Sequence, residues 1–261
     1  MRNDLLAAQT RNASPAGTAI TWIGIGLAVI GALLVLLPGP GYRAHIWSLG
    51  TAFSLIRWGA YCGIAAAILS LLGLIVLVAT RARRWRAFAV AGIVIGGLSI
   101  GVPYAWLQHA RGVPAIHDIS TDTSNPPQFQ AVLAARKDAP NSPIYGGAAI
   151  AAAQHAAYPD IRPILLTVPS QQAFTAALAV VRQNGWQVQA QDPATGHIEA
   201  TATTFWFGFK DDIVIRVRAQ GTGSVVDIRS ESRIGKSDVG KNAARIRHFT
   251  QQIKDRVAKN S

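Results

Sequence analysis

Long apolar runs alternate with short polar stretches through the first 107 residues. Three runs, about residues 19–37, 58–79 and 87–107, contain no Asp, Glu, Lys, Arg or His. Each is long enough to cross the roughly 30 Å hydrocarbon core of a bilayer as a helix. We therefore predict that residues 1–107 form a transmembrane region with three helices. Because no Asp, Glu, Lys, Arg or His interrupts a span, the pattern argues against a transporter.

The first run is predicted to be a retained membrane anchor. A cleaved signal peptide is the alternative, since Arg2 and Arg11 precede the run. The apolar core of a signal peptide is about 7–15 residues long, and this run is longer. No small-residue cleavage site follows it either. Retention is therefore the favoured interpretation.

The two connections between the spans differ in positive charge. The arginines of the second connection are Arg81, Arg83, Arg84 and Arg86, and those of the longer first connection are Arg43 and Arg57. Positively charged connections stay on the cytoplasmic side of a membrane. We therefore expect a multi-pass protein of the cell's inner (plasma) membrane with a cytoplasmic N-terminus. Its C-terminal part would lie on the extracytoplasmic side, which is the periplasm in a bacterium.

Glycines recur four residues apart within the second and third spans. The pairs are Gly59 with Gly63, Gly92 with Gly96, and Gly97 with Gly101. This spacing lets helix backbones approach closely in a membrane. It fits packing among the three spans, and homo-oligomerisation through the same faces is the alternative.

The remainder of the chain divides into a Pro-rich stretch and a regular α+β pattern. Residues 108–162 hold many prolines, which exclude a long regular element, so we predict an extended linker with one short helix. From residue 163 to 261 the order of periodic segments is β-α-β-β-β-β-α. That order predicts a two-layer α+β domain, an antiparallel sheet with two helices on one face. The predicted strands are 164–168, 186–190, 197–204, 213–218 and 224–233, and the helices start near Ser170 and Val239.

Composition narrows the possible chemistry. The net charge of +12 is shared between the two halves, and much of it flanks apolar spans, so membrane topology explains it better than nucleic-acid binding. The lone Cys62 provides no disulfide or Cys-based zinc site within one chain. The histidines show no metal-ligand spacing, and no Gly-rich phosphate loop occurs. We therefore predict no metal, no cofactor and no nucleic-acid partner.

Charged residues alternate along the last two predicted strands. They are Asp212, Arg216 and Arg218 on one strand and Asp227, Arg229, Glu231 and Arg233 on the other. The simplest interpretation is a solvated sheet face stabilised by cross-strand pairs of opposite sign.

An anion-binding site is the functional alternative for the same region. Arg229, Arg233 and Lys236 lead into the start of the last helix, where Ser237 and Asp238 are natural caps. Free backbone N–H groups at a helix start favour an anion, and arginine adds bidentate contacts to phosphate or carboxylate. Candidate anions are a lipid headgroup or an acidic polymer of the cell envelope.

A catalytic site finds less support in the sequence. Asp211 and Asp212 are the best acid pair, but adjacent residues on a strand point to opposite faces and cannot share one proton simply. The serines at 230, 232 and 237 have no histidine beside them in the sequence. No catalytic residue is therefore predicted. A hydrolase or transferase with a site near Asp211, Arg229 and Arg233 remains the alternative.

Aromatic residues are concentrated just before that acid pair. Phe205, Trp206, Phe207 and Phe209 follow one another closely. Core and edge packing is the simplest interpretation of such a cluster. A ligand groove or a contact with the membrane is the alternative.

Residues 198–249 resemble the domain-of-unknown-function family 1499, an uncharacterised group of membrane-associated and exported proteins. The residues that carry the resemblance are Asp211, Asp212, Arg216, Arg229, Ser230, Ser232, Arg233, Gly235, Ser237, Asp238, Gly240, Asn242 and Arg245. With the Asn125-Pro126-Pro127 and Tyr158-Pro159-Asp160 stretches, it covers roughly residues 115–255. The resemblance implies a shared fold and no established activity. Members similar to short lipoproteins often have a cysteine where this chain has Pro127 and Gln128.

Together these patterns predict an envelope protein in which a membrane anchor holds an extracytoplasmic α+β domain. A non-catalytic binding or structural role is favoured. The expected partners are membrane lipids and an anionic lipid, polymer or protein of the envelope.

Overall fold

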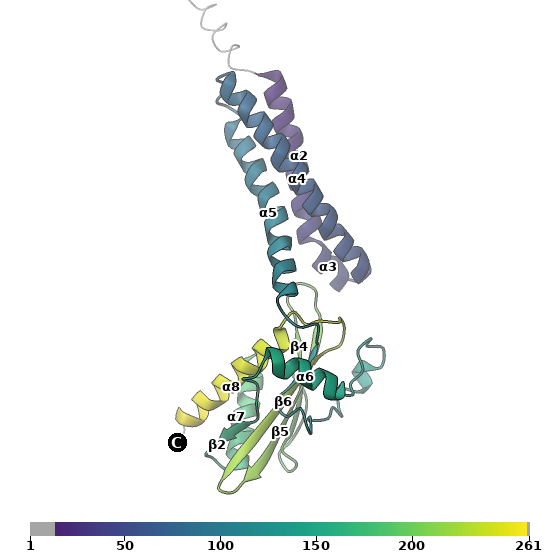
Figure 1. Cartoon of the computed structure of the whole chain (residues 1–261), viewed down its shortest axis with the longest axis vertical. Helices are drawn as coiled ribbons and strands as arrows, with labels where there is room; N and C mark the ends of the chain where they lie inside the picture. Colours follow the sequence, from purple (N-terminus) through teal and green to yellow (C-terminus); the bar gives the residue numbers. More distant parts are fainter. Residues whose placement is uncertain (1–13, 260–261) are drawn as a thin grey trace, which may run out of the picture. The chain divides into compact units, whose positions relative to one another are not determined.

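The structure is a computed structural model that describes residues 14–259. The chain forms two compact units, Met1–Gln108 and His109–Ser261. The first unit is helical and the second is an α+β domain, as the colours of Figure 1 show along the chain. The predicted fold class is confirmed.

Three helices of the first unit are long and apolar enough to cross a membrane: α2 (Pro15–Leu36), α4 (Leu49–Ala79) and α5 (Arg86–Arg111). A short helix, α3 (Pro38–Arg43), lies between α2 and α4. The helix expected near residue 58 begins earlier, at Leu49, because the Ser48 side chain accepts a hydrogen bond from the Thr51 amide (3.1 Å) and caps it. The three predicted helices are thus confirmed, with a longer second helix.

Small residues form the inside of the helical unit, and large apolar residues form the outside. A Cβ atom added at Gly63 would lie 2.8 Å from the carbonyl oxygen of Gly96, so the α4 and α5 backbones are in direct contact there. Trp22, Ile30 and Leu98 are exposed on the outer surface. Large apolar side chains outside and glycine inside are typical of helices packed in lipid.

The α+β domain is built on one antiparallel sheet of six strands in the order β1-β6-β5-β4-β3, with β2 also paired to β6. Its strands are β1 (Asp118–Ser120), β2 (Ile164–Leu166), β3 (Gln187–Asp192), β4 (His197–Thr203), β5 (Lys210–Gln220) and β6 (Gly223–Ser232). Five of them match predicted strands. β1 lies in the Pro-rich stretch and was not predicted, because three residues give no periodic pattern.

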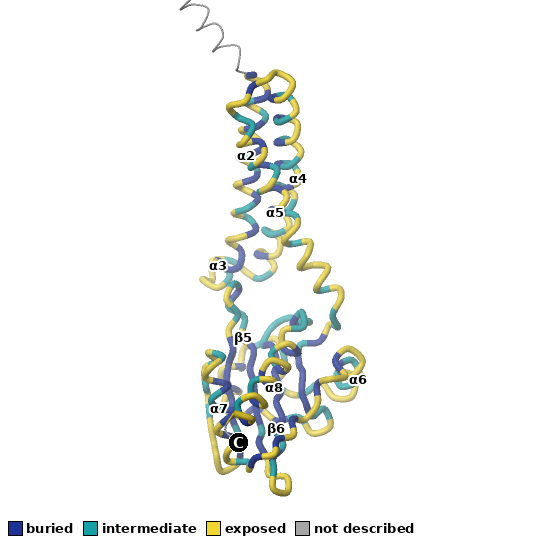
Figure 2. The backbone as a smooth tube through the Cα atoms, turned by 90° about the vertical axis from the view of Figure 1, so that its left-hand side faces the viewer, coloured by how far each residue is buried: buried dark blue, intermediate teal, exposed yellow. Residues whose placement is uncertain are grey.

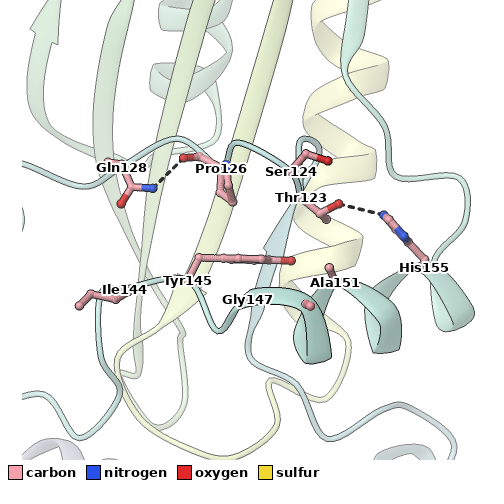
Figure 3. A pocket seen from close by; sticks show the side chains of 10 residues that line it. Thr123, Ser124, Pro126, Gln128, Ile144, Tyr145, Gly147, Ala151 and His155 are labelled. Carbon is pink, nitrogen blue, oxygen red and sulfur yellow. Dashed lines mark hydrogen bonds between the residues drawn. The ribbon is translucent and has the colours of Figure 1, made fainter.

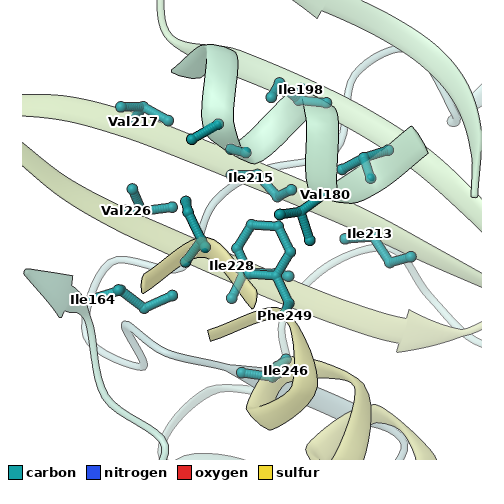
Figure 4. Close-up of a cluster of buried hydrophobic side chains, with 14 of the residues drawn as sticks. Ile164, Val180, Ile198, Ile213, Ile215, Val217, Val226, Ile228, Ile246 and Phe249 are labelled. Carbon is teal, nitrogen blue, oxygen red and sulfur yellow. The ribbon is translucent and has the colours of Figure 1, made fainter. Parts of the chain in front are cut away.

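Helices α7 (Ser170–Gln183) and α8 (Lys241–Lys259) cover one face of the sheet. Figure 4 shows Phe249 of α8 and Val180 of α7 among the isoleucines and valines of β4, β5 and β6. These apolar strand positions alternate with polar positions, whose side chains point to the other face of the sheet. The core therefore lies between helices and sheet, as predicted.

A segment from the Pro-rich stretch, residues 121–146, covers the opposite face of the sheet. We call it the cover segment. It contains the short 3-10 helix η1 (Ala134–Arg136) and is followed by α6 (Gly147–Ala157). Phe129 and Val132 pack on Val214 of β5. Figure 2 shows most of β5 and β6 in dark blue, so successive residues of these strands, whose side chains point to opposite faces, are buried.

Candidate functional site

The polar face of the sheet is buried under the cover segment, so its interpretation as a solvated surface is wrong. Asp212, Asp227, Arg229 and Glu231 are each 0% exposed. The register pairs Arg216 with Asp227, which have opposite signs, but it pairs Asp212 with Glu231, which have the same sign. Two adjacent buried carboxylates need cations from elsewhere.

Arg136 supplies one of these cations from η1. Its Nη1 donates to Oδ2 of Asp212 and its Nη2 to Oε1 of Glu231, both at 2.8 Å. Its guanidinium therefore bridges the two carboxylates that the strand register places side by side. The bridge fixes the cover segment to the sheet at this point.

Arg229 is held by the same layer of charges. Its Nε and Nη2 donate to the two oxygens of Asp118 at 2.9 and 2.8 Å. Nη1 donates to the Pro127 carbonyl oxygen (3.3 Å), and Nη2 also donates to that of Pro143 (2.9 Å). The rings of Phe129 and Tyr145 lie 4.7 and 5.5 Å from the guanidinium carbon. Arg229 thus binds β1 and the cover segment, and it faces no open surface.

Arg233 closes the end of this layer. Its Nε and Nη2 each donate to an oxygen of Asp212 at 2.8 Å, and its Nη1 donates to the Ala135 carbonyl oxygen at 2.9 Å. Burial alone disfavours the charged form of Asp212. Hydrogen bonds from Arg233, Thr201 and Arg136 outweigh burial and lower the pKa of Asp212.

Glu231 has the opposite shift. Burial and the nearby Asp118 carboxylate raise the pKa of Glu231 to about 8, against the opposing effects of Arg136 and Arg229. Burial also raises the pKa of Asp118. Asp118, Glu231 and Asp212 therefore share a closed layer with three guanidiniums, in which burial raises the pKa of the first two and hydrogen bonds lower that of the third.

Glu199 of β4 binds the backbone of the cover segment. Its two carboxylate oxygens accept hydrogen bonds from the amides of Gln130, Ala131 and Val132, at 2.7, 3.0 and 2.9 Å. His197 lies 2.7 Å from the same carboxylate. Burial opposes the charge, but these hydrogen bonds prevail and lower the pKa of Glu199. The carboxylate is a buried anchor for three consecutive amides.

Besides the layer around Arg136 and the Glu199 contacts, a third cluster of charged residues lies toward the other end of the strands. Oδ2 of Asp227 accepts from Nη2 of Arg216 at 2.8 Å and from Nη2 of Arg218 at 2.6 Å. Arg216 also donates to Asp122 of the cover segment at 3.1 Å. All three ion clusters therefore hold the cover segment or β1 on the sheet.

Several of the residues that carry the family resemblance lie on the sheet face covered by α7 and α8, where they form a separate polar cluster. Arg245 of α8 donates to Asp211 (2.6 Å) and to the Ser230 hydroxyl (2.9 Å), which itself donates to Asn242 (2.7 Å). The Asn242 side-chain amide donates to the carbonyl oxygen of His117 and to the Ser232 hydroxyl. These contacts fix the start of α8 to β1, β5 and β6.

Asp211 and Asp212 therefore face opposite sides of the sheet, as strand geometry requires. The expected catalytic alternative needs Asp211, Arg229 and Arg233 in one place. The structure separates them, because Asp211 pairs with α8 while both arginines pair under the cover segment. Their geometry does not favour a shared active site.

The candidate anion site near the start of α8 is divided in the same way. Asp238 caps the helix by accepting from the amides of Gly240 (2.8 Å) and Asn242 (2.6 Å). Ser237 accepts from the Val239 amide and donates to the Pro114 carbonyl oxygen. Gly235 accepts from the Asn141 side chain at 2.9 Å. The candidate anion-binding residues are Arg229, Arg233, Lys236 and Ser237. The first two are engaged under the cover segment, Ser237 is hydrogen-bonded within the turn before α8, and Lys236 is exposed.

A groove of about 540 Å³ lies between the cover segment and α6. Its lining is Thr123, Ser124, Pro126, Gln128, Ile144, Tyr145, Gly147, Ala148, Ala151 and His155. Figure 3 shows the Tyr145 ring along the groove, with its hydroxyl toward the end where Thr123 meets His155 at 3.0 Å. Sequence reasoning did not find this groove, because its residues come from a stretch without periodic pattern.

The Tyr145 hydroxyl is the unusual group of the groove. Its oxygen is buried and has no hydrogen-bond partner among the described residues. Burial and the Asp118 carboxylate raise the pKa of Tyr145 to about 12. The hydroxyl thus stays protonated near neutral pH, but its oxygen is closed to solvent, so Tyr145 contributes the surface of its ring to the groove.

Among residues 14–259, no group of three His, Cys, Asp or Glu side chains is placed to hold a metal ion. Asp118, Arg136 and Glu199, which organise the charged layer, were not among the predicted site residues. Arg136 was hidden because its partners lie on strands remote in the sequence. The available signal was the pairing of Asp212 with Glu231 in the strand register, because two adjacent carboxylates need a cation from another part of the chain.

The fold and site define a class of protein: three helices suited to a membrane, joined to an α+β domain whose polar sheet face is sealed by ion pairs. The chain belongs to the family described as Protein of unknown function (DUF1499), whose model matches residues 118–253. The match begins at the first residue of β1 and therefore includes the cover segment. No curated protein matches the chain.

Proposed function

We propose that this protein is a non-catalytic component of the cell envelope that binds an uncharged, hydroxylated ligand, such as the sugar units of an envelope polymer, in the groove beside α6. The observation that carries the proposal is the contrast between two polar regions. Apart from Nε of Arg136, the polar side-chain atoms of the ion-pair layer are hydrogen-bonded within the fold, whereas the groove presents the side chains of Ser124 and Gln128 to solvent.

The chemistry of the groove supports a neutral ligand. Gln128, Ser124 and Thr123 offer both donors and acceptors, and sugar hydroxyls need both. Pro126, Tyr145 and Ala151 add apolar surface, which suits the C–H faces of a sugar ring. The lining includes no Lys, Arg, Asp or Glu, so a highly charged ligand would find no counter-charge there.

The proposed location is the extracytoplasmic side of the inner membrane. Four arginines between the second and third helices favour a cytoplasmic connection. With three spans, the α+β domain then lies outside, where envelope polymers are found. An alkaline phosphatase fused to the C-terminus should be active in cells, and a fluorescent protein at the same position should be dark. Strong fluorescence without phosphatase activity would contradict this topology.

Ligand binding is tested on the full-length protein in lipid nanodiscs. Neutral saccharides, including N-acetylated hexosamine oligomers, are titrated by calorimetry against matched anionic saccharides. We expect saturable binding of a neutral saccharide that weakens in Ser124→Ala and in Gln128→Ala, because both side chains are exposed in the groove. Gln171→Ala is the matched control, because Gln171 is an exposed glutamine on α7, outside the groove. Equal binding by all variants, or no binding of any neutral saccharide, would refute the groove as the site.

A further inference from the structure

One end of the α+β domain brings together the chain's entry and an aromatic loop. The Ser232 amide donates to the His117 carbonyl oxygen (3.0 Å), and the Arg233 amide donates to that of Lys210 (3.0 Å). The segment leading into β1, the end of β6 and the start of β5 therefore lie side by side. We call this region, with the β4–β5 loop at residues 204–209, the entry end.

The β4–β5 loop has a defined shape. The Thr204 amide donates to the Phe209 carbonyl oxygen (2.8 Å), and the Thr204 hydroxyl accepts from the Phe209 amide (2.9 Å). Gly208 has a φ of 69°, a conformation that glycine adopts without strain. The Phe207 and Phe209 rings are stacked, with centroids 4.9 Å apart. The closed loop holds its tip in place.

Phe205 is at this tip, and its side chain is 92% exposed. Phe207, two residues later, is only 8% exposed. The loop therefore buries one aromatic ring as its base and presents another to the surroundings. A structured loop that exposes a phenylalanine is suited to insertion into an apolar phase.

Two exposed lysines belong to the same end of the domain. Lys210 follows the loop directly, and Lys236 lies on the neighbouring segment after β6. Lys137 and Asp138, which are also exposed near this end, balance each other. The entry end is thus basic, which favours a surface of anionic lipid headgroups.

A short stretch of chain connects this end to the last apolar helix. The exposed aromatic residues Tyr104 and Trp106 occur near the end of α5, as expected where a helix leaves the hydrocarbon core. From Arg111 to Asp118 an extended chain reaches at most about 25 Å. The connecting chain is therefore short enough for the entry end to reach a bilayer surface that α5 crosses.

We propose that the entry end docks on the membrane that the helices cross, with Phe205 inserted at the headgroup level and Lys210 and Lys236 beside lipid phosphates. Lipid is the partner that this surface fits, because the surface combines an exposed apolar residue, exposed lysines and a short connection to a membrane-spanning helix. Docking would fix the orientation of the domain on the membrane. It does not depend on what the groove binds.

The test uses the full-length protein in nanodiscs with Cys62→Ala as background, since Cys62 is the only cysteine. An environment-sensitive fluorophore is attached at Phe205→Cys, or at Thr222→Cys as the control. Thr222 lies in the β5–β6 turn, at the far end of an 11-residue strand. With brominated lipids, the label at 205 should lose about half of its fluorescence, because a group roughly 5–10 Å deep lies among the quenching bromines. The label at 222 should keep its fluorescence.

The lysines are tested in the same background with neutral and anionic nanodiscs. Lys210→Glu combined with Lys236→Glu should reduce the quenching at 205 in anionic nanodiscs to the level seen in neutral ones. Lys254→Glu combined with Lys259→Glu, on exposed positions of α8, is the matched control and should leave it unchanged. Two results together would refute docking on lipid: aqueous iodide quenches the label at 205 as fully as the label at 222, and brominated lipid does not quench the label at 205. Shielding of the label from both quenchers, which indicates a protein partner, would also refute it.

Discussion

Arg229 and Asp118 form a bidentate ion pair that is closed to solvent, with N–O distances of 2.9 and 2.8 Å. The pair joins the middle of β6 to the first residue of β1, more than a hundred positions away in the sequence. It belongs to the layer of buried ion pairs on the sheet face that the cover segment closes. That layer explains why so many charged residues lie on strands without forming an open site.

Removing Asp118 should destabilise the domain strongly. In Asp118→Ala the Arg229 guanidinium stays buried without its main counter-charge, and breaking a buried pair in this way costs about 3–5 kcal/mol. Pulse proteolysis of the full-length protein in detergent, over a urea series, measures the loss. Asp138→Ala is the control: its side chain is exposed, so stability should change by no more than about 0.5 kcal/mol. Equal effects of the two substitutions would contradict the structural role of the pair.

Removing Arg136 should loosen the cover segment and not only lower stability. Without it, Asp212 and Glu231 face each other as two buried carboxyl groups with one bridging cation fewer. Arg136→Ala should therefore cost about 3–5 kcal/mol and expose residues 121–146 to limited proteolysis. The matched control is Arg162→Ala, an exposed arginine bound only to a backbone oxygen among the described residues. An unchanged cleavage pattern in Arg136→Ala would show that η1 is held by other contacts.

The raised pKa of Glu231 gives stability a defined pH dependence. Its pKa rises from the ordinary value of 4.5 to about 8 on folding, so the folded state binds more protons than the unfolded state between these pH values. The contribution of Glu231 to stability therefore falls as pH rises through this window. Urea midpoints from pH 5 to pH 8 should decline in the wild type and decline less in Glu231→Gln. Identical slopes in the two proteins would contradict the raised pKa.

Glycine at position 96 should be essential for packing of the helical unit, whereas glycine at position 97 should not. A Cβ at Gly96 would lie 2.7 Å from the Gly63 carbonyl oxygen, but a Cβ at Gly97 would meet nothing within 4 Å. Gly96→Leu must therefore separate α4 from α5, and Gly97→Leu points outward. A thiol-reactive dye monitors unfolding of the bundle, because Cys62 of α4 is the only cysteine. We expect earlier labelling on heating in Gly96→Leu and wild-type behaviour in Gly97→Leu; the reverse order would contradict the packing.

Regular elements were predictable because each carries its own pattern. The apolar runs predicted three helices, and alternation predicted β2 to β6 with α7 and α8 in the correct order. Helix α4 begins at Leu49 and not near residue 58, because Ser48 caps it and Arg57 does not interrupt it. Sequence periodicity therefore gave the layers of the fold but not every boundary.

The environment of the charged strands was not predictable in the same way. Alternation of Asp227, Arg229 and Glu231 indicates a polar face, and it does not show whether water or protein covers that face. The covering residues, including Arg136, belong to a Pro-rich stretch whose path is fixed only by tertiary contacts. The groove beside α6 depends on that path as well, which is why Tyr145 was missed.

Hydrogen exchange at the amides of Gln130, Ala131 and Val132 tests most directly whether the cover segment seals the polar sheet face. These amides donate to the buried Glu199 carboxylate and belong to no helix or strand. In the full-length protein they should exchange as slowly as amides of β4 and β5, and Glu199→Gln should accelerate them selectively. Exchange in the wild type as fast as at the exposed β5–β6 turn would show an open face and contradict the account.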